Sequence, residues 1–253
     1  MKLNILGSDS RTGNCYILEN DKEALVIECG VSFDKIKKAL NFKLSKVCGC
    51  IVTHGHGDHA KAIHDMMKAG INVHATEGTH KECGSDSHHR ARRIPIRKDQ
   101  EYGEVFYVGS FRVIPFTVMH DAAHPVGFLI NHPETGTILF VTDTYYVKQR
   151  FRGLNNVIVE ANFCQSILDD RLARGENPQF LRDRIFKSHM SLATCKDLLK
   201  SNDLSQVNNI VLIHLSDGNS NAARFKKEVT ELTGKIVHVA EAGMSLPFSK
   251  SPF

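Results

Sequence analysis

Thr53-His54-Gly55-His56-Gly57-Asp58-His59 places three imidazoles and one carboxylate within six residues, directly after the apolar run 47–52. The run predicts a buried strand, and Gly55 and Gly57 allow the chain after it to turn tightly enough for the polar side chains to converge. Imidazole nitrogens and a carboxylate oxygen suit Zn²⁺, Mn²⁺ or iron, and the stretch lacks the thiolates of a closed structural zinc site. An exposed turn rich in histidine is the alternative. The spacing favours a metal site at the carboxyl end of a strand, where open α/β folds carry their chemistry.

The composition is that of a globular protein, and we expect residues 1–253 to form one catalytic domain. Hydrophobic residues make up 42% and charged residues 24% of the chain, which is typical of soluble folded proteins. No linker, repeat or low-complexity segment divides the sequence. The formal charge of +4 permits a polyanionic substrate without requiring one.

Three features of the sequence predict a cytoplasmic location. No apolar stretch approaches the roughly 20 residues of a membrane span, so we expect no membrane association. Met1-Lys2 leads directly into an expected strand and leaves no room for a signal peptide. The seven cysteines are an odd number without a CxxC pair, which favours reduced thiols over a disulfide framework.

The apolar periodicity predicts strands followed by helices, twice over. We expect strands near 2–7, 15–19, 24–28, 47–53, 71–75, 104–108, 111–118, 126–131, 137–142, 156–160, 209–213 and 236–239. We expect helices near 33–40, 59–69, 164–174, 191–200 and 221–233, the last of which ends at Gly234.

The HxHxDH pattern of residues 54–59 resembles the metallo-β-lactamase superfamily, and the resemblance extends over nearly the whole chain. It implies an α/β fold, the αββα sandwich of two mixed sheets flanked by helices. It also implies further ligands, for which His120, Asp143 and His214 are candidates because each ends an expected strand. The family pattern assigns His54, His56 and His120 to one ion, Asp58, His59 and His214 to a second, and Asp143 to both. We therefore expect two divalent metal ions, Zn²⁺ or Mn²⁺.

Other motifs narrow the resemblance to phosphodiesterases. Residues 7–14 are similar to the GS-x-S-x-GN opening of small phosphodiesterase members, although a glycine- and serine-rich hairpin turn is an alternative. Glu160-Ala161-Asn162 and His189-Met190-Ser191 resemble elements of the tRNA 3′-processing endonuclease group. In that group the histidine protonates the leaving oxygen and the glutamate orients it. We accordingly expect catalysis to involve Asp58, Glu160 and His189.

Substrate contacts are less specific in the sequence. Tyr145, Arg92, Ser216 and Asn219 are our candidates, and His124 is a further one because it lies near His120. Ser216 and Asn219 also fit an ordinary loop that leads into a helix. The segment 79–98 concentrates positive charge and is interpreted as a rim that attracts phosphates, a loop that meets a second subunit, or a solvated loop.

The run 140–146, together with the Glu160 and His189 elements, is similar to phage-associated members, and the group it resembles most is the anti-Pycsar phosphodiesterases. That resemblance implies hydrolysis of cyclic mononucleotides (cCMP, cUMP, cAMP, cGMP) to linear monophosphates by a homodimer, in the host cytosol if the protein is phage-encoded. The alternative is a nuclease, either a DNA exonuclease or a tRNA 3′-processing enzyme. A metal-binding scaffold without turnover is the alternative of a different class.

Overall fold

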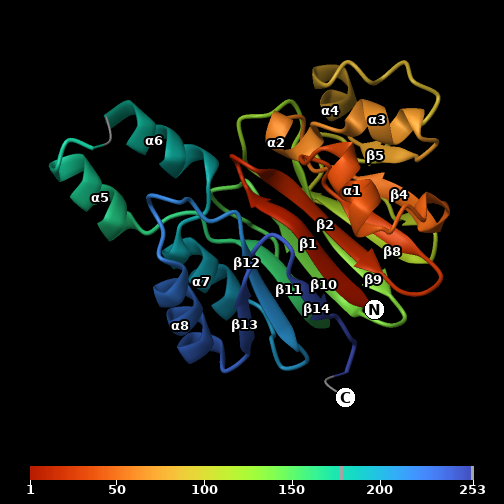
Figure 1. The fold of residues 1–253 in the computed structure, drawn as a ribbon. Coiled ribbons are helices and arrows are strands. Elements are labelled where there is room, and N and C mark those ends of the chain that lie inside the picture. The colour runs from red at the N-terminus through yellow and green to blue at the C-terminus, as the bar shows by residue number, and fades with distance from the viewer. Residues whose placement is uncertain (177–178, 252–253) are drawn as a thin grey trace.

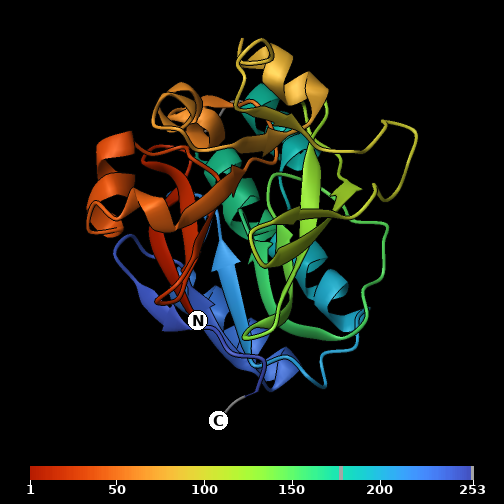
Figure 2. The same cartoon turned by 90° about the vertical axis from the view of Figure 1, so that its right-hand side faces the viewer.

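The computed structural model describes residues 1–176 and 179–251, and the rest of the expected domain 1–253 lies outside the described residues. In the described part, two mixed sheets lie face to face and helices cover the outer face of each (Figure 1). This is the predicted αββα sandwich. Both views place the N-terminus toward the lower end of the molecule and the helices of residues 57–82 toward its upper end (Figures 1 and 2).

The first sheet has the strand order β14-β1-β2-β3-β4-β5-β6. Its strands are β1 (Lys2–Asp9), β2 (Gly13–Glu19), β3 (Ala24–Ile27), β4 (Val47–Ile51), β5 (Val73–Ala75), β6 (Ala91–Arg93) and β14 (Ser245–Pro247). The pairs from β14 to β3 are antiparallel and those from β3 to β6 are parallel.

The second sheet repeats this plan with the order β13-β12-β11-β10-β9-β8-β7. Its strands are β7 (Phe106–Val108), β8 (Phe111–Thr117), β9 (Val126–His132), β10 (Gly136–Val141), β11 (Leu154–Glu160), β12 (Asn209–Ile213) and β13 (Ile236–Val239). Strands β7 to β10 pair antiparallel and β10 to β13 pair parallel. The loops that carry the polar motifs follow the parallel strands β4, β10, β11 and β12 and the antiparallel strand β8.

Most of the helices lie on the outer faces and bury one side against a sheet. They are α1 (Phe33–Ala39), α2 (Gly57–Ala60), α3 (Ile63–Lys68), α4 (Glu77–Glu82), α5 (Gln165–Ala173), α6 (Gln179–Ser188), α7 (Leu192–Lys200) and α8 (Ala222–Thr233), with a 3₁₀ turn at Leu44–Lys46. Met66 of α3 packs on the first sheet and Phe225 of α8 on the second. As predicted, α8 ends at Gly234, whose φ of 65° suits glycine. Figure 1 shows α5 and α6 projecting away from the sandwich.

A shared apolar core between the sheets makes the scaffold rigid. Tyr16 of β2 and Phe140 of β10 are fully buried and meet edge to face across it, with ring centroids 5.5 Å apart. Each such side chain contributes roughly 1.5–3 kcal/mol by leaving water. The core therefore holds the ends of β4, β8, β10, β11 and β12 in fixed relative positions.

The prediction of one helix at 59–69 is wrong, because α2 ends at Ala60 and α3 begins at Ile63. The Ala62 amide donates to the Cys29 carbonyl at 2.9 Å, and the Cys29 amide donates to the His59 carbonyl at 2.8 Å. These bonds to the chain after β3 replace the helical ladder. The segment 79–98 is also not a loop throughout, since it contains most of α4 and all of β6.

Besides the 3₁₀ turn, four described elements lie outside those predicted, namely α4, α6, β6 and β14. The two strands are three residues long, which is too short for an alternation to be recognised, and α6 carries four charged residues in ten. All seven cysteines are free thiols. Within residues 1–176 and 179–251, no helix combines the length and apolar character needed to cross a membrane.

Candidate metal centre

The seven predicted ligands come from four chain segments, each of which follows the carboxyl end of a strand. His54, His56, Asp58 and His59 follow β4, His120 follows β8, Asp143 follows β10, and His214 follows β12. The first segment belongs to one sheet and the others to its partner. The structure brings all seven side chains together where the ends of the two sheets meet.

The first group consists of His54, His56, His120 and Asp143, whose ligating atoms lie within 4.8 Å of one another. The Asp143 Oδ2 atom lies 3.4 Å from His54 Nε2 and 3.6 Å from His120 Nε2. The His120 Nε2 atom is also 3.1 Å from His56 Nδ1. Three imidazole nitrogens thus converge on one carboxylate oxygen.

The second group consists of Asp58, His59, His214 and the same Asp143, again within 4.8 Å. His59 Nε2 lies 3.1 Å from Asp143 Oδ2 and 3.4 Å from Asp58 Oδ2. His214 Nε2 is 3.4 Å from Asp58 Oδ2. The side chains that the sequence analysis assigned to each ion thus lie together, with Asp143 in both groups, and their binding of two ions stays a prediction.

The donor set and its burial fit divalent metal ions. His54 Nε2 is buried without a hydrogen-bond partner among the described residues, although it faces the Asp143 carboxylate. Asp143 has a φ of 46° and His214 a φ of 55°, a left-handed conformation that costs energy outside glycine and persists only where the surroundings hold it. These features suit a site whose ligands are positioned in advance, with the nitrogen and oxygen donors that Zn²⁺ and Mn²⁺ accept.

The electrostatics of the cluster favour ionised carboxylates. Burial alone would raise the pKa of Asp143, but the His214 and His59 imidazoles outweigh it and lower this pKa well below its ordinary value. Burial, followed by the neighbouring His59, lowers the pKa of His54 to about 3 and keeps this imidazole neutral. For His214 the carboxylates outweigh burial and raise the pKa to about 10. A cation bound here would take the place of protons.

Beside the metal ligands, Glu160 and His189 form a hydrogen-bonded pair. His189 follows α6, and its Nδ1 lies 2.8 Å from Glu160 Oε1 and 3.8 Å from Asp143 Oδ1. Glu160 is fully buried, and its Oε2 accepts from the amides of Thr144 at 3.2 Å and Met190 at 3.1 Å. Burial would lower the pKa of His189, but the Glu160 carboxylate outweighs it and raises this pKa. The pair can therefore hold a proton next to the metal ligands.

Three residues that the sequence analysis did not single out as site residues also contact the ligands. The buried Glu28, with a φ of 61°, places its Oε2 3.5 Å from His59 Nδ1 and accepts the Thr53 amide at 3.2 Å. Asn14 Nδ2 lies 3.1 Å from His59 Nε2. Asn162 Nδ2 donates to the His214 carbonyl at 2.7 Å. A charged residue at the end of the apolar strand 24–28 was the available signal for Glu28.

The residues predicted to contact substrate differ in where they lie relative to the candidate metal ligands. Tyr145 is exposed and lies two residues beyond Asp143. The Ser216 amide donates to the Asn162 carbonyl at 2.9 Å, and its Oγ accepts from Asn219 Nδ2 at 3.1 Å, so these two residues brace the loop after His214. Arg92 lies on β6 opposite His74 of β5, and no contact between its side chain and the metal ligands is found in the described residues.

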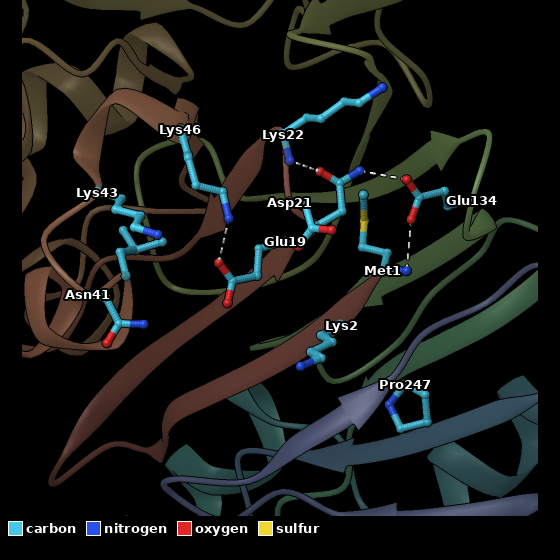
Figure 3. A pocket seen from close by; sticks show the side chains of 12 residues that line it. Met1, Lys2, Glu19, Asp21, Lys22, Asn41, Lys43, Lys46, Glu134 and Pro247 are labelled. Atoms are coloured by element: carbon cyan, nitrogen blue, oxygen red, sulfur yellow. Dashed lines mark hydrogen bonds and ion pairs between the residues drawn. The ribbon is translucent and has the colours of Figure 1, made fainter.

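An open hollow of about 560 Å³ lies beside the start of β1 and the end of β2, at the end of this hairpin away from its turn (Figure 3). Two ion pairs lie in its lining, since Lys46 Nζ lies 3.4 Å from Glu19 Oε2 and the Met1 amine 2.8 Å from Glu134 Oε2. The other end of this hairpin contacts the metal ligands, because Ser8 Oγ accepts the His214 amide at 3.1 Å. The hollow of Figure 3 is thus separate from the metal centre.

The fold is shared with solved structures of other proteins. The metallo-β-lactamase fold protein YhfI from Bacillus subtilis superposes with a TM-score of 0.73 at 15% identity, covering 96% of this chain and 98% of YhfI. The short form of human tRNase Z gives a TM-score of 0.61 at 17% identity and covers 98% of this chain and 99% of its own. At these identities the similarity shows the fold alone.

Sequence comparison adds a closer relationship. The chain is 28% identical over 234 residues to exodeoxyribonuclease YycJ of Bacillus anthracis, which covers 87% of this chain and 84% of YycJ. Residues 9–203 match the family model of the metallo-beta-lactamase superfamily, so the match includes six of the seven clustered ligands. The chain is therefore a metal-dependent hydrolase that belongs to the metallo-β-lactamase superfamily.

Proposed function

We propose that this protein is a two-metal phosphodiesterase whose substrate is a DNA strand. The observation that carries the proposal is the His189–Glu160 pair, held 3.8 Å from the carboxylate that both groups of metal ligands share. When bound, a pair of divalent ions lowers the pKa of water and neutralises negative charge on a phosphate. His54, His56 and His120 would hold one ion, Asp58, His59 and His214 the other, and Asp143 both.

His189 would supply the proton that the leaving group needs in phosphodiester cleavage. The leaving alkoxide of a natural phosphodiester is a poor leaving group near neutral pH, and a positioned acid that protonates it accelerates the reaction by about 10²–10⁴-fold. Burial would lower the pKa of His189, but the charge and hydrogen bond of the buried Glu160 outweigh it and raise this pKa, which favours the protonated imidazolium that an acid requires. Glu160 itself is fixed by the amides of Thr144 and Met190.

The choice of DNA is supported by the similarity to exodeoxyribonuclease YycJ over most of both chains. Cyclic mononucleotides are a second candidate, supported by the exposed ring of Tyr145 two residues beyond Asp143, since one aromatic ring suffices to stack one base. The anti-Pycsar activity, the homodimer and the location in the host cytosol belong to this second candidate and remain predictions. A scaffold without turnover is less favoured, because all seven ligands and the acid pair are present.

A substrate panel tests the proposal. Protein loaded with Zn²⁺ or Mn²⁺ is offered bis(p-nitrophenyl) phosphate, single-stranded and duplex DNA, pre-tRNA and the four cyclic mononucleotides at matched phosphodiester concentration. We expect hydrolysis of the chromogenic diester and release of nucleotides from DNA. Hydrolysis of cCMP or cUMP without attack on DNA would replace DNA by the second candidate. No hydrolysis of any diester would contradict the phosphodiesterase assignment.

A further inference from the structure

Two hollows flank the segment that carries His120, and Lys98 lines both. The first, of about 840 Å³, lies between α4 and the residues after His120, with Arg97, Lys98 and His124 in its lining. The second, of about 270 Å³, lies on the other side and is lined by Lys98, Met119, Tyr146 and Lys148 among others. Together the two hollows form what we call the trough.

The trough is connected to the metal centre by direct bonds. The Met119 amide donates to Thr144 Oγ1 at 3.0 Å, and Thr144 Oγ1 donates to the Tyr146 carbonyl at 2.8 Å. The Thr144 amide in turn donates to Glu160. Tyr146 is therefore tied through one threonine to the strand end before His120 and to the carboxylate that holds His189.

The lining of the trough is mixed in charge, because Glu77, Glu82 and Asp121 line the first hollow and Asp99 and Glu101 the second, beside the cations. Three kinds of group in the lining are placed to contact a nucleic-acid strand. Tyr146 is 45% exposed, which leaves a ring face available for stacking. Lys98 is exposed and forms no ion pair among the residues that the structure describes, and Lys148 adds a second exposed cation in the second hollow. In the first hollow, His124 is 7% exposed, and its Nε2 has no hydrogen-bond partner in the described part of the chain. Buried polar atoms are usually bonded, so a partner from outside the chain fits this position.

We propose that the trough binds the DNA strand on both sides of the phosphate being cleaved, with Tyr146 stacked on a base and Lys98 on a backbone phosphate; this inference rests on the proposed phosphodiesterase function. Proteins that bind single strands combine cations that contact the backbone phosphates with aromatic rings that stack on the bases. A cyclic mononucleotide has one base and one phosphate, and it would leave one of the two hollows without a contact. The trough therefore favours a polymeric substrate.

Binding to a strand that resists cleavage tests the trough separately from catalysis. The metal-loaded protein is titrated into a fluorescein-labelled phosphorothioate oligothymidylate of twelve nucleotides, and anisotropy is recorded at several salt concentrations. Tyr146→Ala should raise Kd by about 5- to 140-fold, the factor that ~1–3 kcal/mol of base stacking gives at 1.4 kcal/mol per tenfold change. Tyr146→Phe, which keeps the ring, should bind like the wild type.

Lys98→Ala should weaken oligonucleotide binding by removing a charge, and not by removing a stacked ring. Losing one phosphate contact should reduce the slope of log K against log salt by about 0.7, whereas Tyr146→Ala should leave that slope unchanged. Tyr107→Ala and Lys200→Ala remove an exposed ring and an exposed cation outside the trough, and both should match the wild type. Thermal unfolding of each variant shows that it is folded.

The outcomes separate the two proposals. If Tyr146→Ala and Lys98→Ala bind the oligonucleotide as tightly as the wild type and with the same salt slope, the trough is not the DNA site. Hydrolysis of bis(p-nitrophenyl) phosphate by the wild type tests the phosphodiesterase function independently, since this diester carries no base or second phosphate. If the wild type hydrolyses this diester and the variants bind the oligonucleotide like the wild type, only the proposed role of the trough is refuted.

Discussion

At the scale of single residues, we propose that His189 and Glu160 act on the leaving group and that the seven clustered side chains bind metal. His189→Ala removes the proton donor but none of the seven clustered ligands. We expect DNA hydrolysis to fall by about 10²–10⁴-fold, while hydrolysis of bis(p-nitrophenyl) phosphate falls far less, because p-nitrophenolate leaves without a proton. Steady-state rates on both substrates, with metal content measured in parallel, check this. Equal losses on the two substrates would mean that His189 is not the acid.

Asp143 is the residue on which both groups of ligands depend. Asp143→Asn keeps the side-chain volume, and asparagine tolerates the φ of 46° at this position, so the fold should be retained. The charge that the two groups of candidate ligands share is lost, and we expect metal content to fall below that of the wild type together with turnover. Circular dichroism and metal analysis distinguish this from unfolding. Asp65→Asn on the exposed face of α3 is the matched control, and an Asp143→Asn protein with full metal content would argue against the shared ligand.

The candidate ligands could be proposed from the sequence because they are histidines and aspartates in loops that follow apolar runs. Their separation in the chain did not matter, since the ends of β4, β8, β10 and β12 come together where the two sheets meet. Glu28 and Asn14 were not assigned because one lies at the end of an expected strand and the other in a turn motif, and their role depends on which loop packs against them. Tyr146 and Lys98 belong to segments that only the tertiary fold brings together.

At the scale of elements, the loop between β4 and α2 is shaped by the chain after β3. A Cβ atom at Gly30 would collide with the Asp58 carbonyl carbon and oxygen, so Gly30→Ala must displace the residues that carry Asp58 and His59. We expect metal affinity to weaken by about 10- to 100-fold, as for other losses of support around a ligand. Competition with a chromogenic chelator measures it. Gly57→Ala, where a Cβ meets nothing within 4 Å, is the control, and equal affinities in the two variants would contradict this role of Gly30.

Elements with a clear period were predictable, and those set by tertiary contacts were not. The alternation and apolar runs of the long strands and the amphipathic pattern of α8 predicted their places. The break between α2 and α3 depends on the bonds of His59 and Ala62 to Cys29, which lies about thirty residues earlier in the chain. The helix α4 and strand β6 were not predicted, because positive charge dominates their segment. The strand β6 forms by pairing with β5, and the charge pattern does not indicate that pairing.

At the scale of the whole molecule, Glu23 links the two sheets. It lies between β2 and β3 and accepts the Ser110 amide at 3.0 Å from the β7–β8 turn, and it lies 3.2 Å from His132 Nε2 on β9. Burial would raise the pKa of Glu23, but the bonds from Ser110, Cys48 and His132 outweigh it and lower the pKa to about 2. Because the folded pKa is below the unfolded value near 4.5, the ionised group stabilises the fold above pH 4.5 and loses this effect as the pH falls toward 2.

Glu23→Gln should therefore lower the free energy of unfolding by about 1–3 kcal/mol at pH 7, the usual cost of losing a charged hydrogen-bond acceptor. The difference between variant and wild type should narrow steadily below pH 4.5. Urea unfolding at pH 7, 5, 4 and 3 measures both quantities. A difference that stays constant over this range would show that the charge of Glu23 is not what joins the sheets.

At the meeting point of the two sheets, we propose a centre that holds two divalent ions. Protein purified without chelators from cells supplied with zinc and manganese can be analysed for metal by inductively coupled plasma mass spectrometry, with protein concentration from amino-acid analysis. The seven clustered ligands and the shared Asp143 predict about two ions per chain. A value of one ion or fewer per chain, in protein that is folded and has not met a chelator, would contradict the two-metal centre.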